Sequence, residues 1–367
     1  MMRDDNPRWE CGSEFHWCGL PEPPFLPWPA HFRSYLLGRH AVAALTQMNS
    51  GRRVTLWLPS YFCPEVADAC RSLCELREYR DDPRLPEPDW DTLRPEARDF
   101  VLAVNYFGVR EEIPWQRWRE IHPCRLVEDH TQDPFSPWAL HSTAEYAFAS
   151  LRKTLPVADG ALLWSPRGEL LPEQPREVSS DWQGSVLKMA ALFRKADYLA
   201  GRGGDELKPY FRDLQARGEQ LLRGSGISAM TPYSLAYIAN GAPAVWREQR
   251  LRNAMRLQAR LSNLGTARGV FRSWPAGSVP FALLLEFASE TERNHYQSEL
   301  RRHNIYCPVH WVCQTTDANA IDFCSRVLSI PIDQRYGEYD MDRIAETFER
   351  LQLDDVPLTS GVRAQTK

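Results

Sequence analysis

The sequence lacks any hydrophobic run long enough to cross a membrane. The longest apolar stretches among its 367 residues, such as 160–164 and 281–287, fall far short of the roughly 20 residues that a membrane span needs. Residues 1–17 contain no apolar segment after a basic start, so we expect no secretory signal. We therefore expect a cytoplasmic protein that does not act at a membrane.

An excess of charge of one sign is also absent. Lys and Arg number 44 and Asp and Glu number 48, which gives a formal net charge of -4. A chain without a global basic field is poorly suited to bind a phosphate backbone, so we expect no nucleic-acid partner. With 43% hydrophobic and 25% charged residues over this length, the composition excludes disorder and favours a globular chain of two domains.

Motifs for metals and disulfides are missing as well. The nine cysteines are an odd number without CxxC spacing, which indicates reduced thiols. The nine histidines show no HxH or HExxH pattern, so a metal hydrolase is disfavoured and no metal is expected. Lysine is scarce, which leaves few candidates for chemistry that needs an amine. The five lysines are Lys153, Lys188, Lys195, Lys208 and Lys367.

Short apolar segments alternate with amphipathic ones along the first half of the chain, and no internal repeat interrupts them. This order predicts a mostly parallel sheet covered by helices on both faces, which is an α/β fold. The predicted strands are 54–58, 100–105, 125–128, 145–149 and 160–164. The predicted helices are 64–73, 113–121 and one within 34–48 that starts near 38–40.

The second half of the chain predicts a different organisation. From about residue 189 it becomes predominantly helical, and a smaller α+β domain follows, with strands at 281–287 and 327–331. Helices are predicted there at 244–264, 290–303 and 341–351. We divide the chain into a lead segment 1–33, a large domain 34–240, a small C-terminal domain 241–355 and a disordered tail 356–367.

The predicted strand ends carry chemically distinctive residues, and ligands of open α/β sheets bind at such ends. A lysine amine such as that of Lys153 can form a Schiff base with pyridoxal phosphate. A fixed carboxylate such as Asp129 keeps the ring nitrogen of that cofactor protonated, so that the ring withdraws electrons. The helix start at 38–41 offers backbone N–H groups to a phosphate. Taken singly, Lys153 could be a surface lysine and Asp129 a helix cap.

Five motifs follow one another along the first half of the chain. They are GRHA at 38–41, LPSYF at 58–62, VNYFG at 104–108, VEDHTQ at 127–132 and SLRKTLPVADGALL at 150–163. In this order they resemble the DegT/DnrJ/StrS aminotransferases, which are pyridoxal-phosphate sugar aminotransferases with the aspartate aminotransferase fold (fold type I). The likeness is carried mainly by 34–164, and the chain is identified as a divergent member.

The resemblance assigns the two catalytic roles and the ring contacts. It implies that Lys153 forms the Schiff base and that Asp129 pairs with the pyridinium nitrogen. Gln132 matches the glutamine near the phenolic side of the ring. Either Tyr61 or Phe62 matches the aromatic residue that covers one face of the ring, and a shift of one residue would place Cys63 there instead.

The resemblance also implies a phosphate site. Gly38, Arg39 and His40 match the turn whose backbone contacts the phosphate, and Ser150 matches the strand serine that reaches it. The chain departs from the family where Asn105 replaces a histidine, and where Gly160-Ala161 replaces a glycine pair. These departures leave the cofactor chemistry intact and the substrate open.

The function that the resemblance implies is amino transfer from an amino-acid donor to a keto group of a sugar or small secondary metabolite, in biosynthesis, by a homodimer. The same cofactor also supports elimination, decarboxylation or condensation, and a non-catalytic binding or regulatory protein could keep the same fold. One further histidine, His310, follows Cys307-Pro308-Val309 in a loop that could face substrate. The simpler expectation is that His310 lies at the surface.

Overall fold

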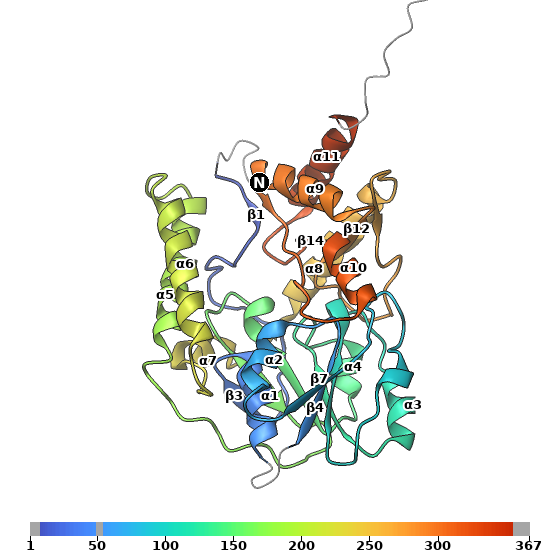
Figure 1. The fold of residues 1–367 in the computed structure, drawn as a ribbon. Helices are drawn as coiled ribbons and strands as arrows, with labels where there is room; N and C mark the ends of the chain where they lie inside the picture. The colour runs from blue at the N-terminus through green and yellow to red at the C-terminus, as the bar shows by residue number, and fades with distance from the viewer. Residues whose placement is uncertain (1–7, 49–53, 355–367) are drawn as a thin grey trace, which may run out of the picture.

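The core of the molecule is a seven-stranded sheet. The computed structural model describes residues 8–48 and 54–354, so the predicted tail 356–367 lies outside the described residues (Figure 1). Along the sheet the strands are β3 (Phe32–Tyr35), β9 (Ala161–Trp164), β8 (Tyr146–Ser150), β7 (Arg125–Asp129), β6 (Phe100–Val104), β4 (Thr55–Pro59) and β5 (Glu75–Tyr79).

The five strands from β8 to β5 pair in parallel, and β9 runs antiparallel to both of its neighbours, β8 and β3. Because parallel strands point the same way, the residues that follow β4, β6, β7 and β8 gather at one edge of the sheet. The predicted α/β fold with a mostly parallel sheet is confirmed.

Both faces of this sheet are buried, as its apolar strands predict. Leu56 and Leu58 pack in the core beneath helices α1 and α2, whereas Trp57 between them packs on the opposite face with Trp115 and Trp138. This alternation follows from the two-residue repeat of a strand. The helices that cover the two faces are α1 (Gly38–Gln47), α2 (Pro64–Cys70), α3 (Ile113–Ile121) and α4 (Pro137–His141).

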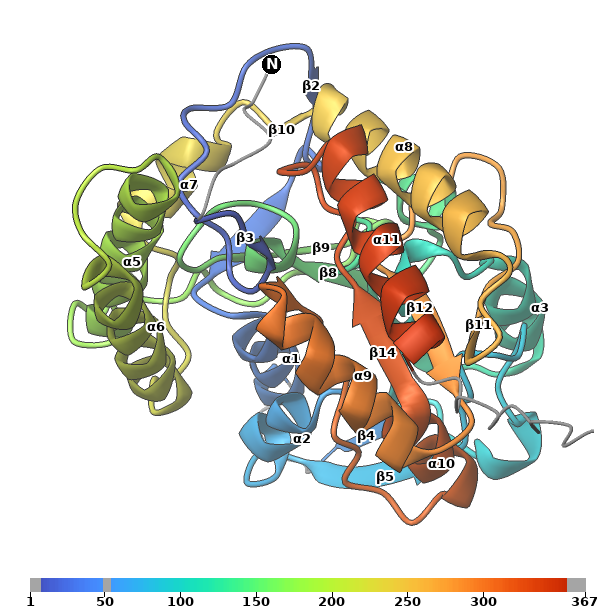
Figure 2. The same cartoon turned by 90° about the horizontal axis from the view of Figure 1, so that it is seen from above.

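A second, three-stranded antiparallel sheet lies beside the first and builds its own core. Leu257, Tyr296 and Phe348 from three helices pack on Leu283 and Ile330 of its strands, and Figure 2 shows these helices across one face of the sheet. The sheet has the order β11 (Ala267–Gly269), β12 (Leu283–Phe287) and β14 (Val327–Ile330), and the helices are α8 (Ala244–Leu261), α9 (Glu290–Arg302) and α11 (Glu338–Asp354). The smaller α+β part is thereby confirmed.

Three further groups of elements lie outside these two sheets. Helices α5 (Gln183–Leu199) and α6 (Leu207–Arg223) form an antiparallel pair at one side of the molecule (Figure 1). The N-terminal segment contributes β1 (Cys11–Gly12), which pairs with β13 (Ile305–Tyr306) of the smaller part. The remaining elements are β2 (Phe25–Leu26), α7 (Pro232–Ile238), β10 (Ala242–Pro243) and α10 (Ala318–Arg326).

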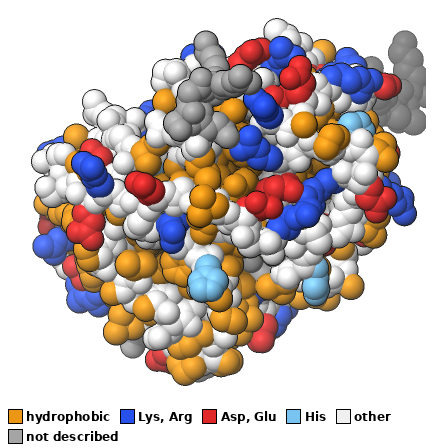
Figure 3. Space-filling view, turned by 90° about the horizontal axis from the view of Figure 1, so that it is seen from below, with side chains coloured by type: hydrophobic (Ala, Val, Ile, Leu, Met, Phe, Trp, Pro, Cys, Tyr) orange, Lys and Arg blue, Asp and Glu red, His pale blue; other side chains and the backbone are white. Residues whose placement is uncertain are grey.

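No helix in residues 8–48 and 54–354 is long and apolar enough to span a membrane. On the face seen from below in Figure 3, Lys and Arg side chains are interspersed with Asp and Glu and do not form one continuous basic patch.

A buried ion pair joins two of the loops at the edge of the sheet where the strands end. Arg110 follows β6, and its Nη1 donates to Oδ2 of Asp81, which follows β5, over 2.7 Å. The two side chains are 5% and 0% exposed. Burial raises the pKa of the Asp81 carboxyl to about 6, although the Arg110 charge opposes this rise. The ion pair therefore joins the loop after β5 to the loop after β6. Each buried charge is stabilised by the other.

We predict that Arg110→Met lowers the free energy of unfolding by about 3 to 5 kcal/mol, because it leaves the Asp81 carboxylate buried and unpaired. Adding Asp81→Leu should restore most of that loss. The matched control is Arg71→Met, since the Arg71–Asp68 pair is exposed and should cost less than about 1 kcal/mol. Denaturant unfolding measures all three variants, and equal losses for Arg71→Met and Arg110→Met would contradict the prediction.

Candidate functional site

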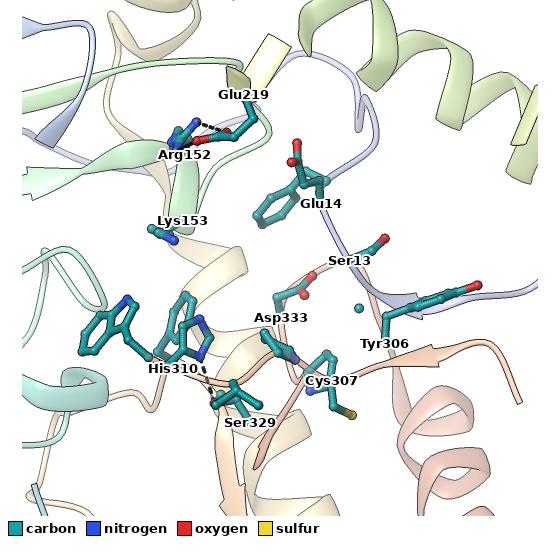
Figure 4. A pocket seen from close by; sticks show the side chains of 18 of the residues that line it. Ser13, Glu14, Arg152, Lys153, Glu219, Tyr306, Cys307, His310, Ser329 and Asp333 are labelled. Atoms are coloured by element: carbon teal, nitrogen blue, oxygen red, sulfur yellow. Dashed lines mark hydrogen bonds and ion pairs between the residues drawn. The ribbon is translucent and has the colours of Figure 1, made fainter. Parts of the chain in front are cut away.

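Three side chains predicted from the sequence, those of Asp129, Gln132 and Lys153, line one cavity. This inner cavity has a volume of about 20 Å³, which is room for about one water molecule. Lys153 also borders an outer cavity of about 690 Å³, within the roughly 300–1,000 Å³ of ordinary ligand pockets. Figure 4 shows Lys153 at one side of the outer cavity, with Ser13, Glu14 and Tyr306 across from it.

Lys153 is held in a tight turn directly after β8. The turn is a short 3₁₀ helix, Leu151–Lys153, and it is anchored because the Leu151 N–H donates to the carbonyl of Gly160 over 2.9 Å. Burial lowers the pKa of the Lys153 amine, and the positive charge of the adjacent Arg152 lowers it further. A lysine made less basic in this way is a better nucleophile toward a carbonyl.

Arg152 is tied to the helical pair and is not free to bind an anion. Its guanidinium donates two hydrogen bonds to Glu219 of α6, at 2.9 and 3.0 Å. The Nζ of Lys188 in α5 donates to the same carboxylate at 2.7 Å and also pairs with Glu14 of the N-terminal segment. Burial alone would raise the pKa of Glu219, but these two cations hold it below its ordinary value. The network locks the Lys153 turn to α5 and α6.

Asp129 ends β7 as a buried carboxylate. Its Oδ1 accepts a hydrogen bond from the N–H of Thr131 over 2.8 Å, and it forms no ion pair within the described residues. Burial raises the pKa of Asp129, although the Thr131 hydrogen bonds and the charges of His130 and Lys153 oppose this rise. The Asp129 carboxylate therefore has no ion-pair partner among the described residues. A cation such as a protonated ring nitrogen would supply one.

Gln132 supports the turn after the neighbouring strand. Its Oε1 accepts from the N–H of Phe107 over 2.5 Å, and Phe107 has a φ of 55°, in the left-handed region that side chains rarely adopt. Gln132 thus connects the loop after β7 to the loop after β6, at the rim of the inner cavity.

The start of α1 approaches Ser150 closely. A Cβ added to Gly38 would lie 3.2 Å from the Cβ of Ser150, so a glycine lets the helix N-terminus and the strand end meet. The side chains beside it turn away, because Arg39 donates to Glu65 at 2.9 Å and to the Leu222 carbonyl at 2.6 Å. The start of α1 and Ser150 thus lie close together, and the N–H of His40 is already used, because it donates to the carbonyl of Leu37 over 3.0 Å.

His40 is buried at the start of α1, and neither ring nitrogen makes a well-aligned hydrogen bond within the described residues. Burial, helped by the charge of Arg39, lowers the pKa of His40 to about 3, so its ring is neutral. The backbone of Ser225 is close enough to oppose the fall in the pKa of the ring.

The two aromatic residues predicted to cover a cofactor ring lie deeper in the core. Tyr61 is 0% exposed, and its ring packs on those of Tyr106, Trp311 and Phe323. Phe62 contacts Trp311, and neither predicted ring lines either cavity. Their proposed role stays a prediction.

Cys63, the third candidate for this position, does line the outer cavity. Burial raises the pKa of its thiol, and the nearby charge of Lys153 partly offsets that rise.

Three residues of the smaller part, Phe281, His310 and Trp311, complete the inner cavity, and the sequence did not predict that they meet there. His310 and Trp311 line both cavities together with Lys153. The expectation that His310 lies at the surface is wrong, because it is 8% exposed. Its loop lies more than 150 residues from Lys153 along the chain, so only the docking of the two parts brings them together. The proline before it and the adjacent tryptophan were the available signals.

Within residues 8–48 and 54–354, no group of three or more His, Cys, Asp or Glu side chains is arranged to hold a metal ion. The donor set suits an organic cofactor instead: an amine of lowered basicity, a buried carboxylate without a cation, and a glycine-bounded helix start. The inner cavity alone is too small for an aromatic ring, so a ring bound beside Asp129 needs space toward the outer cavity, past His310 and Trp311.

No family model and no curated protein sequence matches the chain. Solved structures do match it in fold. A DegT DnrJ EryC1 StrS aminotransferase from Brucella abortus is 14% identical with a TM-score of 0.56, over 88% of this chain and 86% of that one. The PLP form of Spr1654 from Streptococcus pneumoniae, named as a sugar aminotransferase, is 11% identical with a TM-score of 0.61, over 88% and 87%. DesI, solved in the presence of its TDP-sugar product, is 15% identical with a TM-score of 0.55, over 88% and 80%.

These likenesses establish that the chain has the fold of pyridoxal-phosphate aminotransferases.

We predict that Lys153 reacts as a free amine at lower pH than Lys208. Burial and Arg152 lower the pKa of Lys153, whereas that of Lys208 is raised, so the neutral form of Lys153 appears first as pH increases. Competitive trace labelling with acetic anhydride, followed by peptide mapping, gives the pH of half-labelling for each lysine. A half-labelling pH for Lys153 equal to or above that for Lys208 would show that its environment does not activate it.

Proposed function

We propose that the chain is a pyridoxal-phosphate aminotransferase of the DegT/DnrJ/StrS kind. It moves an amino group from an amino-acid donor to a keto group of a sugar or small secondary metabolite. The observation that carries this proposal is the pairing of Lys153 and Asp129 around one cavity on this fold. Neighbours of the same fold are named as sugar aminotransferases, and one was solved with a TDP-sugar.

When bound, pyridoxal phosphate supplies an electron-withdrawing ring that stabilises negative charge on the carbon next to the amino group. Lys153 would hold the cofactor through its Nζ, and Asp129 would accept a hydrogen bond from the ring N–H and keep that nitrogen protonated. The backbone N–H groups of Gly38 and Arg39 and the hydroxyl of Ser150 would bind the phosphate. Gln132, at the rim of the inner cavity, would border the ring on its phenolic side.

Lys153 would also move the proton. With a substrate amine bound in its place, the amine of Lys153 would stay in the same turn, held by the Arg152–Glu219 pair. Its lowered pKa leaves a larger neutral fraction, which would accept a proton from the carbon of the donor and later release it within the site.

The nine cysteines are all free thiols, and we place the enzyme in the cytoplasm on that ground.

We predict that the purified chain develops a visible absorption band with pyridoxal phosphate, and that borohydride reduction fixes the adduct on Lys153. Lys153→Met should abolish the band, whereas the control Lys208→Met, outside the cavity, should retain it. Peptide mapping of the reduced adduct is the measurement. An adduct on Lys188 or Lys195, or no band at all, would refute the assignment, and the absence of a band would favour a non-catalytic binding protein.

The same preparation tests the reaction. An amino donor should convert the band to that of the pyridoxamine form, and a keto acceptor should restore it. Asp129→Asn should keep the adduct but slow this conversion about 100-fold, in the range typical for loss of one preorganised electrostatic group. Consumption of the donor without pyridoxamine formation would favour elimination, decarboxylation or condensation instead.

We also propose a homodimer. A hollow of about 640 Å³ lies beside the start of α1, lined by Arg39, His40, Glu65 and Arg223. This hollow adjoins the proposed phosphate end, so a segment of a second copy placed there would complete the site. Sedimentation of the purified chain should give twice the 42.3 kDa of one copy. Sedimentation as a single copy across the micromolar range would contradict the dimer while leaving the cofactor assignment open to its own test.

A further inference from the structure

His310 reaches the Lys153 site from the smaller part of the molecule. It lies in the loop between β13 and α10 and borders both the inner and the outer cavity. Figure 4 shows its ring near Lys153 on the same side of the pocket. A buried imidazole at this place is not used by the roles proposed above for Lys153, Asp129 and Gln132.

The ring of His310 is held in one orientation. Its Nδ1 forms a hydrogen bond of 2.9 Å with Oγ of Ser329 in β14. Ser329 is fixed in turn because its N–H donates to the carbonyl of Pro308 over 3.1 Å. The rings of Phe107 and Phe281 pack edge-on against the imidazole. Because Nδ1 is hydrogen-bonded and aromatic side chains pack on the ring, the imidazole cannot rotate freely. Nε2 is therefore held in one direction.

Nε2 has no hydrogen-bond partner within the residues that the structure describes, and it is not enclosed by protein. Burial, together with the positive charge of Lys153, lowers the pKa of His310 to about 3. The ring is therefore neutral near pH 7, and one of its nitrogens carries a lone pair.

The neighbouring groups decide which nitrogen carries the proton. Lys153 presents only N–H donors, and a donor substrate arriving at the same place brings an amine or ammonium group. A proton on Nε2 would face these donors and leave the lone pair directed at Ser329. A proton on Nδ1 instead lets Ser329 Oγ accept a hydrogen bond and leaves the lone pair of Nε2 for a donor in the cavity that Lys153 also lines.

We propose that His310 is a catalytic residue of this site: its Nε2, which borders the same cavity as Lys153, accepts a hydrogen bond from the substrate amine that takes the place of the Lys153 amine. The hydrogen bond holds the rotation of that amine so that its lone pair points at the carbon under attack. No proton needs to move to His310, which stays neutral throughout. The role toward a substrate amine rests on the proposed function. The tautomer of His310 is inferred from the structure alone.

The tautomer can be measured without cofactor. In the ¹⁵N-histidine-labelled chain, comparison with His310→Gln assigns the two ring nitrogens of His310. We expect Nε2 to show the shift of an unprotonated nitrogen and Nδ1 that of a protonated one near pH 7. We also expect Lys153→Met to move the Nε2 resonance. A protonated Nε2 in the wild-type chain overturns the proposal, whatever the cofactor spectra show.

Substitutions separate the acceptor role from a packing role. The amide end of a glutamine reaches about as far as Nε2, and that of an asparagine about as far as Nδ1. We therefore expect His310→Gln to retain the donor-driven conversion within about tenfold of the wild type. His310→Asn and His310→Leu should lose about 100-fold, within the range of a single acid–base group. All three variants should keep the Lys153 adduct. His303→Gln, an exposed histidine at the end of α9, is the control and should leave the rate unchanged.

The outcomes separate the two proposals. An unprotonated Nε2 in a chain that forms no Lys153 adduct would refute the aminotransferase proposal and leave the acceptor geometry standing. An intact adduct with equal rates for His310→Gln, His310→Asn and His310→Leu would overturn the role of His310 and leave the aminotransferase proposal intact. Loss of the adduct in all three variants would show that the ring only supports packing, which also overturns it.

Discussion

The pairing register of two neighbouring strands decides which carboxylate faces Lys153. Asp129 of β7 stands opposite Phe148 of β8 in a parallel ladder, and the chain reaches Lys153 a few residues beyond. Because side chains alternate along a strand, the adjacent Glu128 points to the other face of the sheet, where it binds Nε2 of His130 at 2.9 Å. A slip of one residue would exchange the two carboxylates. The site therefore depends first on backbone hydrogen bonds in the sheet, and only then on contacts among its own side chains.

Most of the charged side chains around Lys153 are held in ion pairs. Arg152, the residue before it, is held by Glu219, and Glu219 is shared with Lys188. Arg152 is therefore close enough to lower the pKa of Lys153. Because its guanidinium is already paired with Glu219, it is not free to bind another anion. Asp129 is in the opposite situation, since it is buried without an ion pair in the described part of the chain. A cofactor with a cationic ring nitrogen and an anionic phosphate complements this pattern at both ends.

Those parts of the fold that depend on short-range pattern could be predicted from the sequence. The apolar runs of β6 to β9 and the amphipathic helices α3, α9 and α11 were found close to their observed ends. The strand β5 was missed because it lies at the sheet edge, where its glutamates and arginine face solvent and hide the apolar signal. The short antiparallel strand β3 was missed because it follows a proline-rich segment.

The same division applies to the site. Lys153, Asp129 and Gln132 come from consecutive strand ends of one sheet, so their order along the chain predicted that they meet. His310 and Trp311 come from the loop between β13 and α10 in the smaller part. Their position depends on how the two parts dock, which no local pattern encodes. For the aromatic pair Tyr61 and Phe62, both rings pack against Trp311 and line neither cavity, so their role toward a cofactor ring stays a prediction.

One physical cause, removal from water, acts on Lys153, Asp129 and His310 together. Burial is the largest influence on each of their pKa values, lowering those of Lys153 and His310 and raising that of Asp129. In each case it favours the neutral form. For Lys153 this supplies a nucleophile, and for His310 it supplies an acceptor. For Asp129 it means that the carboxylate is stabilised only when a cation arrives beside it. Because His310 and Trp311 border the cavity that Lys153 and Asp129 also line, the contact between the two parts of the molecule sets the chemistry of the site as well as its shape.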